Sequence, residues 1–321
     1  MLQAQALYAP VISELALVDE RLRSIRRPEY PLLEPILATM LNQGGKRIRP
    51  ALTLLVGRLH DYQLDRLIPM ATGVELLHTA TLIHDDVVDK AGLRRRRPTT
   101  FAQWGTGPAV LAGDYLFAAA ADQVARTENQ RVIRLFANTL MVIAQGELAQ
   151  VFAAHRWQAS RELYFERISA KTATLFATAA ESGGVLSLAP EPAVQALLEY
   201  GHALGMAFQL TDDILDFVGD EQELGKPVGS DLLQGTLTLP AFWLVERYPE
   251  GNAIRRYFEG RAPEDLAQAI EAVRNSPGLE EAQVVAGSYG ERARRALIGL
   301  PASAAVQALL DLVDYVLERR I

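Results

Sequence analysis

Cysteine is absent from this chain of 321 residues, and basic residues are fewer than acidic ones. Without cysteine there is no disulfide framework and no thiolate chemistry, and a reducing compartment is compatible with the sequence. The 32 Lys and Arg residues are outnumbered by 39 Asp and Glu, which gives a net charge of −7. That balance argues against general nucleic-acid binding, so we expect no nucleic acid among the partners.

Long uninterrupted apolar segments are missing as well. The most apolar stretch, 109–125, is broken by Asp114 and Asp122, so no segment is expected to span a membrane. The N-terminal residues show no basic segment followed by an apolar one, so we expect no signal peptide. These absences together favour a cytoplasmic protein.

The alternating β-branched pattern of strands is nearly missing, whereas Ala and Leu dominate. Apolar residues recur at helical spacing over 2–24, 63–89, 108–126, 128–155, 160–182, 191–219 and 301–319. Gly and Pro cluster between such segments, for example at Ser182-Gly183-Gly184, and no linker is long or polar enough to divide domains. We therefore predict one all-α domain over residues 1–321, with more than ten helices. Several helices are apolar nearly all round, which indicates burial at the centre or at a subunit interface.

One acidic motif occurs twice, as Asp85-Asp86-Val87-Val88-Asp89 and as Asp212-Asp213-Ile214-Leu215-Asp216. On a helix, positions i and i+4 share a face and i+1 lies about 100° round it, so each motif projects three carboxylates from one patch. Like charges in an apolar stretch need a strong counter-charge, and hard oxygen ligands suit Mg²⁺. A single copy can be a solvated helix face, but two copies favour metal sites that hold a diphosphate.

Two groups of basic residues suit phosphate binding. The segment Gly44–Pro50 is a glycine turn that leads into a predicted helix, where Lys46 and Arg49 can point the same way. Arginine offers bidentate bonds to a phosphate and lysine a point charge. The run Arg94–Arg97 begins five residues after Asp89, where a phosphate clamp or lid is favoured over a solvated loop.

Isolated polar residues complete the candidate set. Lys171-Thr172 lies in a predicted helix, and Lys226 follows a predicted helix end. Gln209 lies one turn before the second acidic motif, and His78 lies two turns before the first. Each residue alone has an ordinary alternative, such as a snorkelling lysine, a capping amide or a buried core histidine.

Taken together, these segments resemble the trans-isoprenyl diphosphate synthases, also called polyprenyl synthetases, and most of all the long-chain bacterial enzymes. The resemblance covers essentially the whole chain. It rests, in the family's order and spacing, on Gly44–Pro50, Leu77–Asp89, Leu93–Arg95, Lys171–Ala173, Gln209–Asp216 and Gly225–Asp231. It implies a single-domain orthogonal helical bundle of the isoprenoid synthase type with a central apolar tunnel.

The resemblance also implies an activity, namely trans-prenyl transfer. Isopentenyl diphosphate would condense head-to-tail (1′-4) with an allylic diphosphate to give an all-trans polyprenyl diphosphate. Ionisation of the carbon–oxygen bond makes an allylic cation and pyrophosphate, and fixed cations and metal ions stabilise the developing negative charge. No protein nucleophile is needed, the departing pyrophosphate can take the proton, and apolar walls exclude water.

The resemblance implies about three Mg²⁺ ions per active site, and it implies which aspartates bind them. The direct ligands are expected to be Asp85, Asp89 and Asp212. Ligands that act through water, or secondary ligands, are expected to be Asp86, Asp213 and Asp216.

The substrate-binding residues follow in the same way from the resemblance. The cations expected to help hold the allylic diphosphate are Arg94, Lys171 and Lys226. The residues that match the site for isopentenyl diphosphate are Lys46, Arg49, His78 and Arg95. The polar groups expected near the allylic carbon are Thr172 and Gln209.

Chain length is expected to depend on the wall formed by Leu77, Ala80 and Thr81. In the family, bulky aromatic residues at the latter two positions stop growth at short products, whereas here both residues are small. We therefore predict products of about C30 or longer, with geranylgeranyl diphosphate as the main alternative. A large residue from another helix, such as Phe136 or Met141, could instead set an earlier floor.

The partners implied are isopentenyl diphosphate, an allylic primer such as farnesyl or geranylgeranyl diphosphate, and a second copy in a homodimer. Transient membrane association for product release is compatible. Two departures from the family pattern stand out. Arg96 replaces a common glycine, and Gly235-Thr236 replaces a common Gly-Lys, which puts one diphosphate contact in doubt.

Two rival functions are a class I terpene cyclase and a non-catalytic subunit of a heteromeric synthase. Cyclases usually replace the second acidic motif with an Asn/Ser/Glu type, and regulatory subunits tend to lose aspartates. Both acidic motifs are intact here, which argues against each rival.

Overall fold

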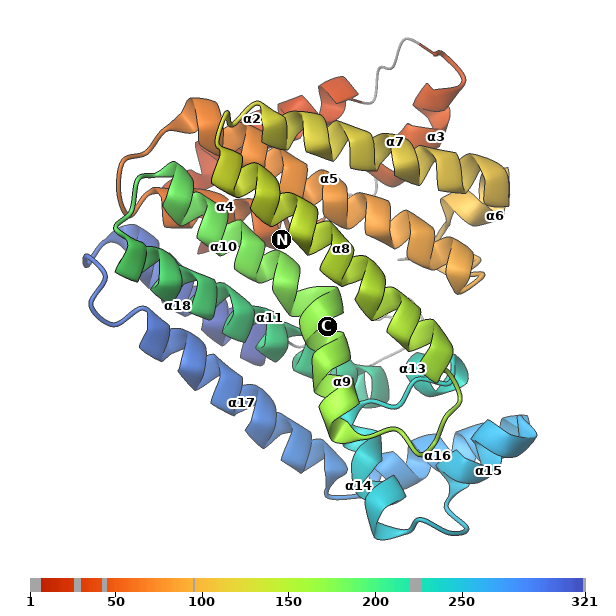
Figure 1. Cartoon of the computed structure of the whole chain (residues 1–321). Coiled ribbons are helices and arrows are strands. Elements are labelled where there is room, and N and C mark those ends of the chain that lie inside the picture. The colour runs from red at the N-terminus through yellow and green to blue at the C-terminus, as the bar shows by residue number, and fades with distance from the viewer. Residues whose placement is uncertain (1–6, 26–29, 42–44, 95, 220–226, 320–321) are drawn as a thin grey trace. The chain divides into compact units, whose positions relative to one another are not determined.

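The computed structural model describes residues 7–25, 30–41, 45–94, 96–219 and 227–319, which are mostly helical (Figure 1). The chain forms two compact units. Unit 1 comprises Met1–Thr139, Leu175–Gly201 and Arg294–Leu312, and unit 2 comprises Leu140–Thr174, His202–Ala293 and Val313–Ile321. The expectation of one domain over the whole chain stays a prediction, whereas the prediction of helices is confirmed.

Unit 1 begins with helices and contains the described strands. Its elements are η1 (Ala9–Val11), α2 (Ile12–Ile25), α3 (Leu33–Leu41), α4 (Ile48–Gly57), α5 (Leu64–Val88), β1 (Leu93–Arg94), β2 (Arg97–Pro98), α6 (Thr100–Trp104) and α7 (Thr106–Ala125). The two strands form one short antiparallel hairpin in which Arg94 pairs with Arg97.

Unit 2 contains shorter helices with turns between them. Its elements are α9 (Arg161–Ile168), η2 (Ser169–Ala173), α13 (Ser230–Leu233), α14 (Leu239–Arg247), α15 (Ala253–Gly260) and α16 (Pro263–Arg274). Helices that contribute residues to both units are α8 (Gln130–Ala153), α10 (Thr174–Leu186), α11 (Glu191–Val218), α17 (Gly278–Ala296) and α18 (Ala304–Leu317).

Helix α5 carries the first acidic motif at its C-terminal end and lies at the core of unit 1. It packs mainly against α7 and α4, and the segment 67–77 is buried throughout. A helix that is apolar on all sides must be covered on all sides, which agrees with the apolar composition of this segment. The core therefore fixes the direction of α5 up to the last turn, where the aspartates begin.

The glycine pair in Ser182-Gly183-Gly184 was expected to separate helices, and this expectation is wrong. Helix α10 runs through both glycines to Leu186. A Cβ on Gly183 would lie 2.7 Å from the Thr53 carbonyl oxygen, and a Cβ on Gly184 would lie 3.0 Å from Leu197 Cδ1. The two glycines therefore serve close helix packing rather than a turn.

The core of unit 2 surrounds the second half of α11. It includes the large side chains Tyr164, Phe217 and Phe242, with Leu210 and Ile214 from the same face of α11. Fully burying one such side chain contributes about 1.5–3 kcal/mol, so this cluster holds α11 firmly beside α9 and α14. The second acidic motif is thereby presented from a rigid helix.

Helix α8 has the length and composition of a membrane-spanning segment, although no such segment was expected. Among the described residues, it alone is long and apolar enough to do so by length and composition, and 28% of its most apolar window is buried. Its charged residues lie toward its ends, which leaves an apolar centre. A core helix in a globular protein passes the same test.

Candidate active site

The first acidic motif forms the last turn of α5, and its three carboxylates have different surroundings. Asp86 is fully buried, and its Oδ1 accepts a hydrogen bond from Arg94 Nε at 2.8 Å. Its Oδ2 is buried without a hydrogen-bond partner. Burial raises the pKa of Asp86, while the Arg94 guanidinium opposes the shift. Asp85 is half-buried and Asp89 is exposed, so these two carboxylates can reach a ligand.

After this motif, Arg94 lies in β1 and Arg97 in β2 of the short hairpin. Arg94 is held by Asp86, and Arg96 has a φ of 62°. A left-handed backbone costs a non-glycine residue energy, so Arg96 carries a strain here that a glycine would not. Arg95 lies outside the described residues.

The basic residues around the start of α4 divide into a structural cation and two candidate ligands. Arg47 has a left-handed backbone and its guanidinium bonds Asp19 at 3.0 Å and Glu75 at 2.5 Å. Lys46 is exposed, and the Arg49 guanidinium lies 4.5 Å from the centroid of the Phe176 ring. Arg47 therefore anchors the segment, an assignment that the sequence analysis missed.

The predicted wall residues lie on α5. Leu77 and Ala80 are fully buried, and Thr81 is half-buried and donates to the His78 carbonyl oxygen at 2.8 Å. His78 is itself half-buried. The tunnel that these residues would line stays a prediction. Of the two alternative floor residues, Phe136 is buried and Met141 is exposed.

The second acidic motif lies near the end of α11 in unit 2. Asp212 is 40% exposed, and its Oδ1 pairs with Arg319 Nη2 at 2.8 Å. Arg319 also stacks on the Phe208 ring, 4.3 Å from its centroid. No sequence pattern after α18 links Arg319 to an aspartate more than a hundred residues away, so this pair could not be predicted.

Asp213 is buried and both of its oxygens accept hydrogen bonds. Tyr164 Oη donates to Oδ2 at 2.6 Å, and Gln209 Nε2 donates to Oδ1 at 2.8 Å. Burial raises the pKa of Asp213 to about 6, and the two hydrogen bonds oppose that shift. Burial also raises the pKa of Tyr164, with the Asp213 charge adding to the effect, so Tyr164 stays a donor.

Asp216 is fully buried and ties the chain after α11 back to that helix. Its Oδ1 accepts from Ser230 Oγ at 2.7 Å, and its Oδ2 accepts from the backbone N–H of Asp231 at 3.1 Å. The backbone N–H of Gly229 donates to the Asp216 carbonyl oxygen. This aspartate therefore fixes the segment that follows Lys226, which itself lies outside the described residues.

Lys171 and Thr172 lie in the π-helical turn η2 rather than in a regular helix as expected. Thr174 Oγ1, directly after this turn, donates to the Ser169 carbonyl oxygen at 2.9 Å. Such single π-turns are frequent at functional sites. Thr172 Oγ1 donates to Gln209 Oε1 at 2.6 Å, so the turn brings two predicted site residues into contact.

The turn also brings Lys171 against α8. Gly146 lets the backbones approach, since a Cβ there would lie 2.9 Å from Ala170 Cβ. The Lys171 ammonium then pairs with the Glu147 carboxylate at 2.8 Å. To bind the Lys171 ammonium, a diphosphate would have to displace the Glu147 carboxylate or share the ammonium with it. Glu147, like Arg47 and Arg319, could not be assigned from the sequence.

Comparison with known proteins identifies the family. The profile of the polyprenyl synthetase family matches residues 30–275. The chain belongs to the polyprenyl synthetase family. It is 38% identical over 318 residues to "heptaprenyl diphosphate synthase component 2" of Geobacillus stearothermophilus, covering 99% of both chains.

Solved structures of the family agree. The decaprenyl diphosphate synthase of Rhodobacter capsulatus has a TM-score of 0.92 at 39% identity, with 98% of each chain covered. A polyprenyl synthase of Caulobacter crescentus CB15, complexed with calcium and isoprenyl diphosphate, has a TM-score of 0.94 at 34% identity, with 99% of this chain and 98% of that chain covered. The predicted family, the all-α isoprenoid synthase fold and the trans-prenyltransferase class are thereby confirmed.

Members of this family use Mg²⁺ to bind diphosphate, and the residues present fit that ion. Asp85, Asp89 and Asp212 offer accessible carboxylates, and Asp86 has a buried oxygen without a partner. Among the described residues no three His, Cys, Asp or Glu side chains are already gathered as a metal cluster. Mg²⁺ does not require one, since it keeps several waters and binds through one or two carboxylates together with substrate phosphates. The role of each aspartate stays a prediction.

Proposed function

We propose that this protein makes all-trans polyprenyl diphosphates of about C30 or longer from isopentenyl diphosphate and an allylic primer, with about three Mg²⁺ ions per site. The observation that carries the proposal is a full-length match to long-chain synthases by a chain that keeps all six aspartates of both acidic motifs. The retained aspartates distinguish it from a non-catalytic subunit and from a terpene cyclase.

The residues of unit 2 suit the ionisation of an allylic diphosphate. Mg²⁺, when bound, neutralises the diphosphate and makes pyrophosphate a better leaving group. The Lys171 ammonium provides a positive charge for the diphosphate, and Glu147 holds it in place until a diphosphate displaces that carboxylate or shares the ammonium with it. Thr172 and Gln209 supply polar oxygens, and the buried apolar side chains around them exclude water.

The residues of unit 1 suit isopentenyl diphosphate. Lys46 is exposed, and Arg49 and His78 are half-buried, so each can offer a donor to a phosphate. Arg94, which the resemblance assigns to the allylic diphosphate instead, is held by Asp86 through Nε. Fixing a guanidinium in this way lowers the entropy lost when it clamps a phosphate.

The proposed product length rests on the small residues of α5. Ala80 is fully buried, and neither Ala80 nor Thr81 carries an aromatic ring. The two long-chain relatives named above are a heptaprenyl and a decaprenyl synthase, which supports growth beyond C20. Geranylgeranyl diphosphate is the alternative product if another side chain closes the path.

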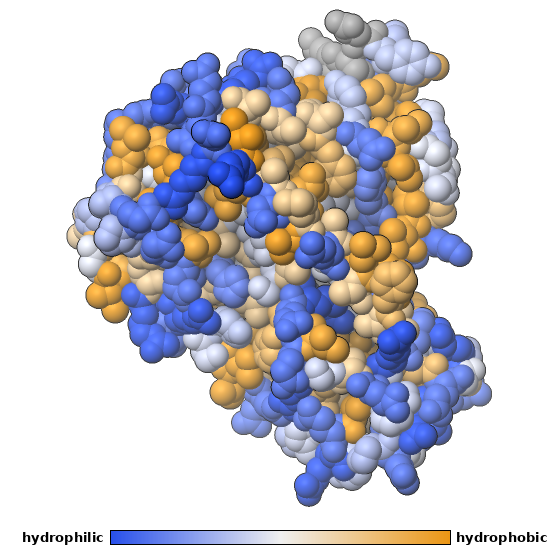
Figure 2. Space-filling model, viewed as in Figure 1, coloured by the Kyte–Doolittle hydropathy of each residue, from blue (hydrophilic) through white to orange (hydrophobic). Residues whose placement is uncertain are grey.

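We also propose a homodimer, supported by the surface of α8. Met141, Leu148 and Phe152 on this helix are 56%, 57% and 69% exposed. Figure 2 shows apolar side chains at the surface among polar ones. Methionine and aromatic side chains are enriched in protein interfaces, and an apolar face of this kind needs a cover. The word "component" in the name of one relative makes a second, different subunit the alternative partner.

The experiment that tests the function uses the purified protein alone with Mg²⁺, isopentenyl diphosphate and geranyl, farnesyl or geranylgeranyl diphosphate. After dephosphorylation, the mass of the product gives its chain length. A C30 or longer prenol supports the proposal, and a C20 end product favours the alternative. A cyclic hydrocarbon, or activity only with a second protein, would contradict it. Light scattering of the same sample measures the oligomeric state.

A further inference from the structure

Four buried or half-buried side chains of unit 2 form one hydrogen-bond chain. Tyr164 Oη donates to Asp213 Oδ2 at 2.6 Å, and Gln209 Nε2 donates to Asp213 Oδ1 at 2.8 Å. Thr172 Oγ1 donates to Gln209 Oε1 at 2.6 Å. The chain therefore runs from α9 through α11 to the π-turn η2, and it begins at Tyr164, to which the family resemblance assigns no role.

The direction of this chain follows from the donors and acceptors. A carboxylate only accepts, so the amide nitrogen of Gln209 must face Asp213 and its oxygen must face Thr172. The Thr172 hydroxyl has one proton, which is committed to that amide oxygen. The remaining directions around Thr172 Oγ1 therefore carry lone pairs and no proton.

We propose that Tyr164 is a positioning residue that sets this direction, so that Thr172 offers lone pairs to the electron-poor allylic carbon. The inference rests on the proposed function, in which an allylic cation forms near Thr172. A lone pair stabilises a cationic carbon, whereas a hydroxyl proton aimed at it would destabilise it. Preorganised dipoles of this kind need no rearrangement during the reaction.

Tyr164 is suited to this role because it is itself fixed. It is buried, and its ring packs edge-to-face against Phe165 and Phe242. Its hydroxyl occupies one Asp213 oxygen and leaves the other for Gln209. Without the hydroxyl, the Asp213 carboxylate can rotate and the amide can turn over, which frees the Thr172 proton to point the other way.

The first test compares two tyrosine variants that each lose one buried hydrogen bond. Tyr164→Phe keeps the ring and removes the hydroxyl from the chain. Tyr200→Phe is the matched control, because Tyr200 is fully buried in unit 1 and its hydroxyl donates to the Leu309 carbonyl oxygen at 2.7 Å. Both variants should lower the Tm by similar amounts. Only Tyr164→Phe should lower kcat, by about tenfold, with the KM for isopentenyl diphosphate within about twofold.

The second test is a double-mutant cycle on kcat. Thr172→Val removes the oxygen through which Tyr164 acts, so adding Tyr164→Phe to Thr172→Val should cost less than about twofold more. A further tenfold loss in the double variant, or equal losses in Tyr164→Phe and Tyr200→Phe, would overturn the inference. The wild-type product in the same assay reports separately on the proposed function. A wild-type protein without prenyl transfer would overturn both.

Discussion

The imidazole of His84, on α5, occupies the space that a side chain at Gly113, on α7, would need. A Cβ built on Gly113 would overlap the His84 ring. His84 Nε2 lies 3.2 Å from the Val110 carbonyl oxygen, and the ring packs edge-to-face on Phe117 at 5.1 Å. His84, which makes this close contact, directly precedes Asp85, so the contact fixes the residue that begins the first acidic motif.

Gly113→Ala should therefore displace His84 and lower both stability and turnover. Overpacking of this kind costs about 1–3 kcal/mol. Gly107→Ala is the control on the same helix, because no atom lies within 4 Å of a Cβ there. The control should be neutral, or stabilised by up to about 1 kcal/mol as glycine leaves a helix. Urea unfolding and steady-state kinetics measure both variants. Equal behaviour of the two would contradict this account of the α5–α7 contact.

Asp85→Ala and Asp212→Ala should each lower Mg²⁺-dependent turnover by about 100-fold or more, since both remove an expected metal ligand. Neither should unfold the protein, because Asp85 is half-buried and Asp212 is 40% exposed. Asp122→Ala is the control, a surface carboxylate whose partner is Arg126, four residues on. Circular dichroism checks the fold. Near-normal turnover in either site variant would rule out a mechanism that needs both motifs.

Arg49→Ala should raise the KM for isopentenyl diphosphate and leave the KM for the allylic substrate nearly unchanged. Losing a charge-assisted contact costs about 1.5–3 kcal/mol, which corresponds to about 10–100-fold in affinity. Arg49 also stacks on Phe176, so Arg49→Lys serves to keep the charge while losing that stacking. Initial rates with each substrate varied in turn give the two values. A rise confined to the allylic substrate would mean that the two sites are assigned the wrong way round.

Much of this architecture follows from local sequence. The long segments 63–89 and 191–219 predicted helices that the structure places at Leu64–Val88 and Glu191–Val218. Apolar residues at helical spacing decide such elements by themselves, and the acidic motifs lie near the ends of both helices. What could be predicted is therefore which helix presents each group of carboxylates.

The partners of those carboxylates could not be predicted from local sequence. Glu147 and Lys171 meet because Gly146 permits close packing against a π-turn, and a π-turn leaves no periodic signal. Arg319 reaches Asp212 across the fold of unit 2. Pairings of this kind depend on tertiary packing, which also explains why a glycine pair in α10 was taken for a turn.

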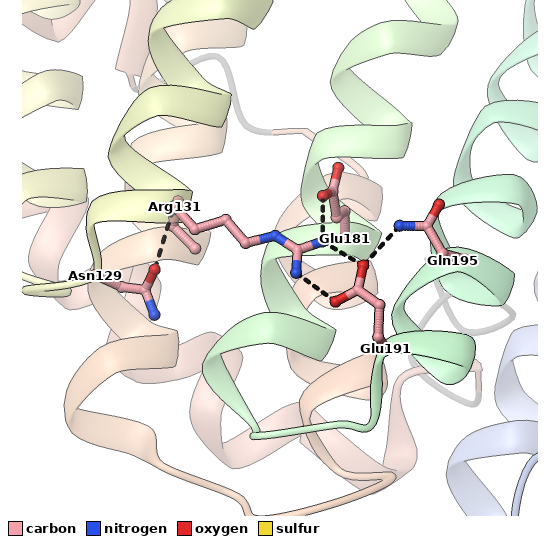
Figure 3. Close-up of polar contacts among 6 residues, drawn as sticks. Asn129, Arg131, Glu181, Glu191 and Gln195 are labelled. Atoms are coloured by element: carbon pink, nitrogen blue, oxygen red, sulfur yellow. Dashed lines mark hydrogen bonds and ion pairs between the residues drawn. The ribbon is translucent and has the colours of Figure 1, made fainter.

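Acid should weaken the ion pair between Arg131 and Glu191 in unit 1. Arg131 bonds Glu191 at 2.6 Å and Glu181 at 3.0 Å, and Gln195 also donates to Glu191 (Figure 3). The hydrogen bonds from Arg131 and then Gln195 lower the pKa of Glu191 from 4.5 to about 2. Because the folded pKa is depressed, the stabilisation is complete above about pH 4.5 and is lost as the pH falls toward about 2.

Unfolding by urea between pH 2 and pH 6 measures this effect. Glu191→Gln should reduce the dependence of stability on pH within the window from about 4.5 down to about 2, because the titrating group is gone. High salt should reduce it as well, since this pair is exposed to solvent. An unchanged acid profile in Glu191→Gln would show that other carboxylates dominate the acid sensitivity.

Ala80→Phe should shorten the products sharply. A growing prenyl chain must run away from the acidic motifs between helices, and the side chain of Ala80 is fully buried on α5 beside the predicted path. A phenylalanine ring there cannot be moved aside cheaply in a close-packed wall, so elongation should stop near C15 to C20 instead of about C30 or longer. Ala109→Phe on α7, also fully buried, tests whether any added ring has the same effect. Both variants are compared by the mass of their dephosphorylated products and by thermal unfolding. If Ala80→Phe folds and its product distribution matches the wild type, then the chain does not pass this wall, and Phe136 becomes the next residue to substitute.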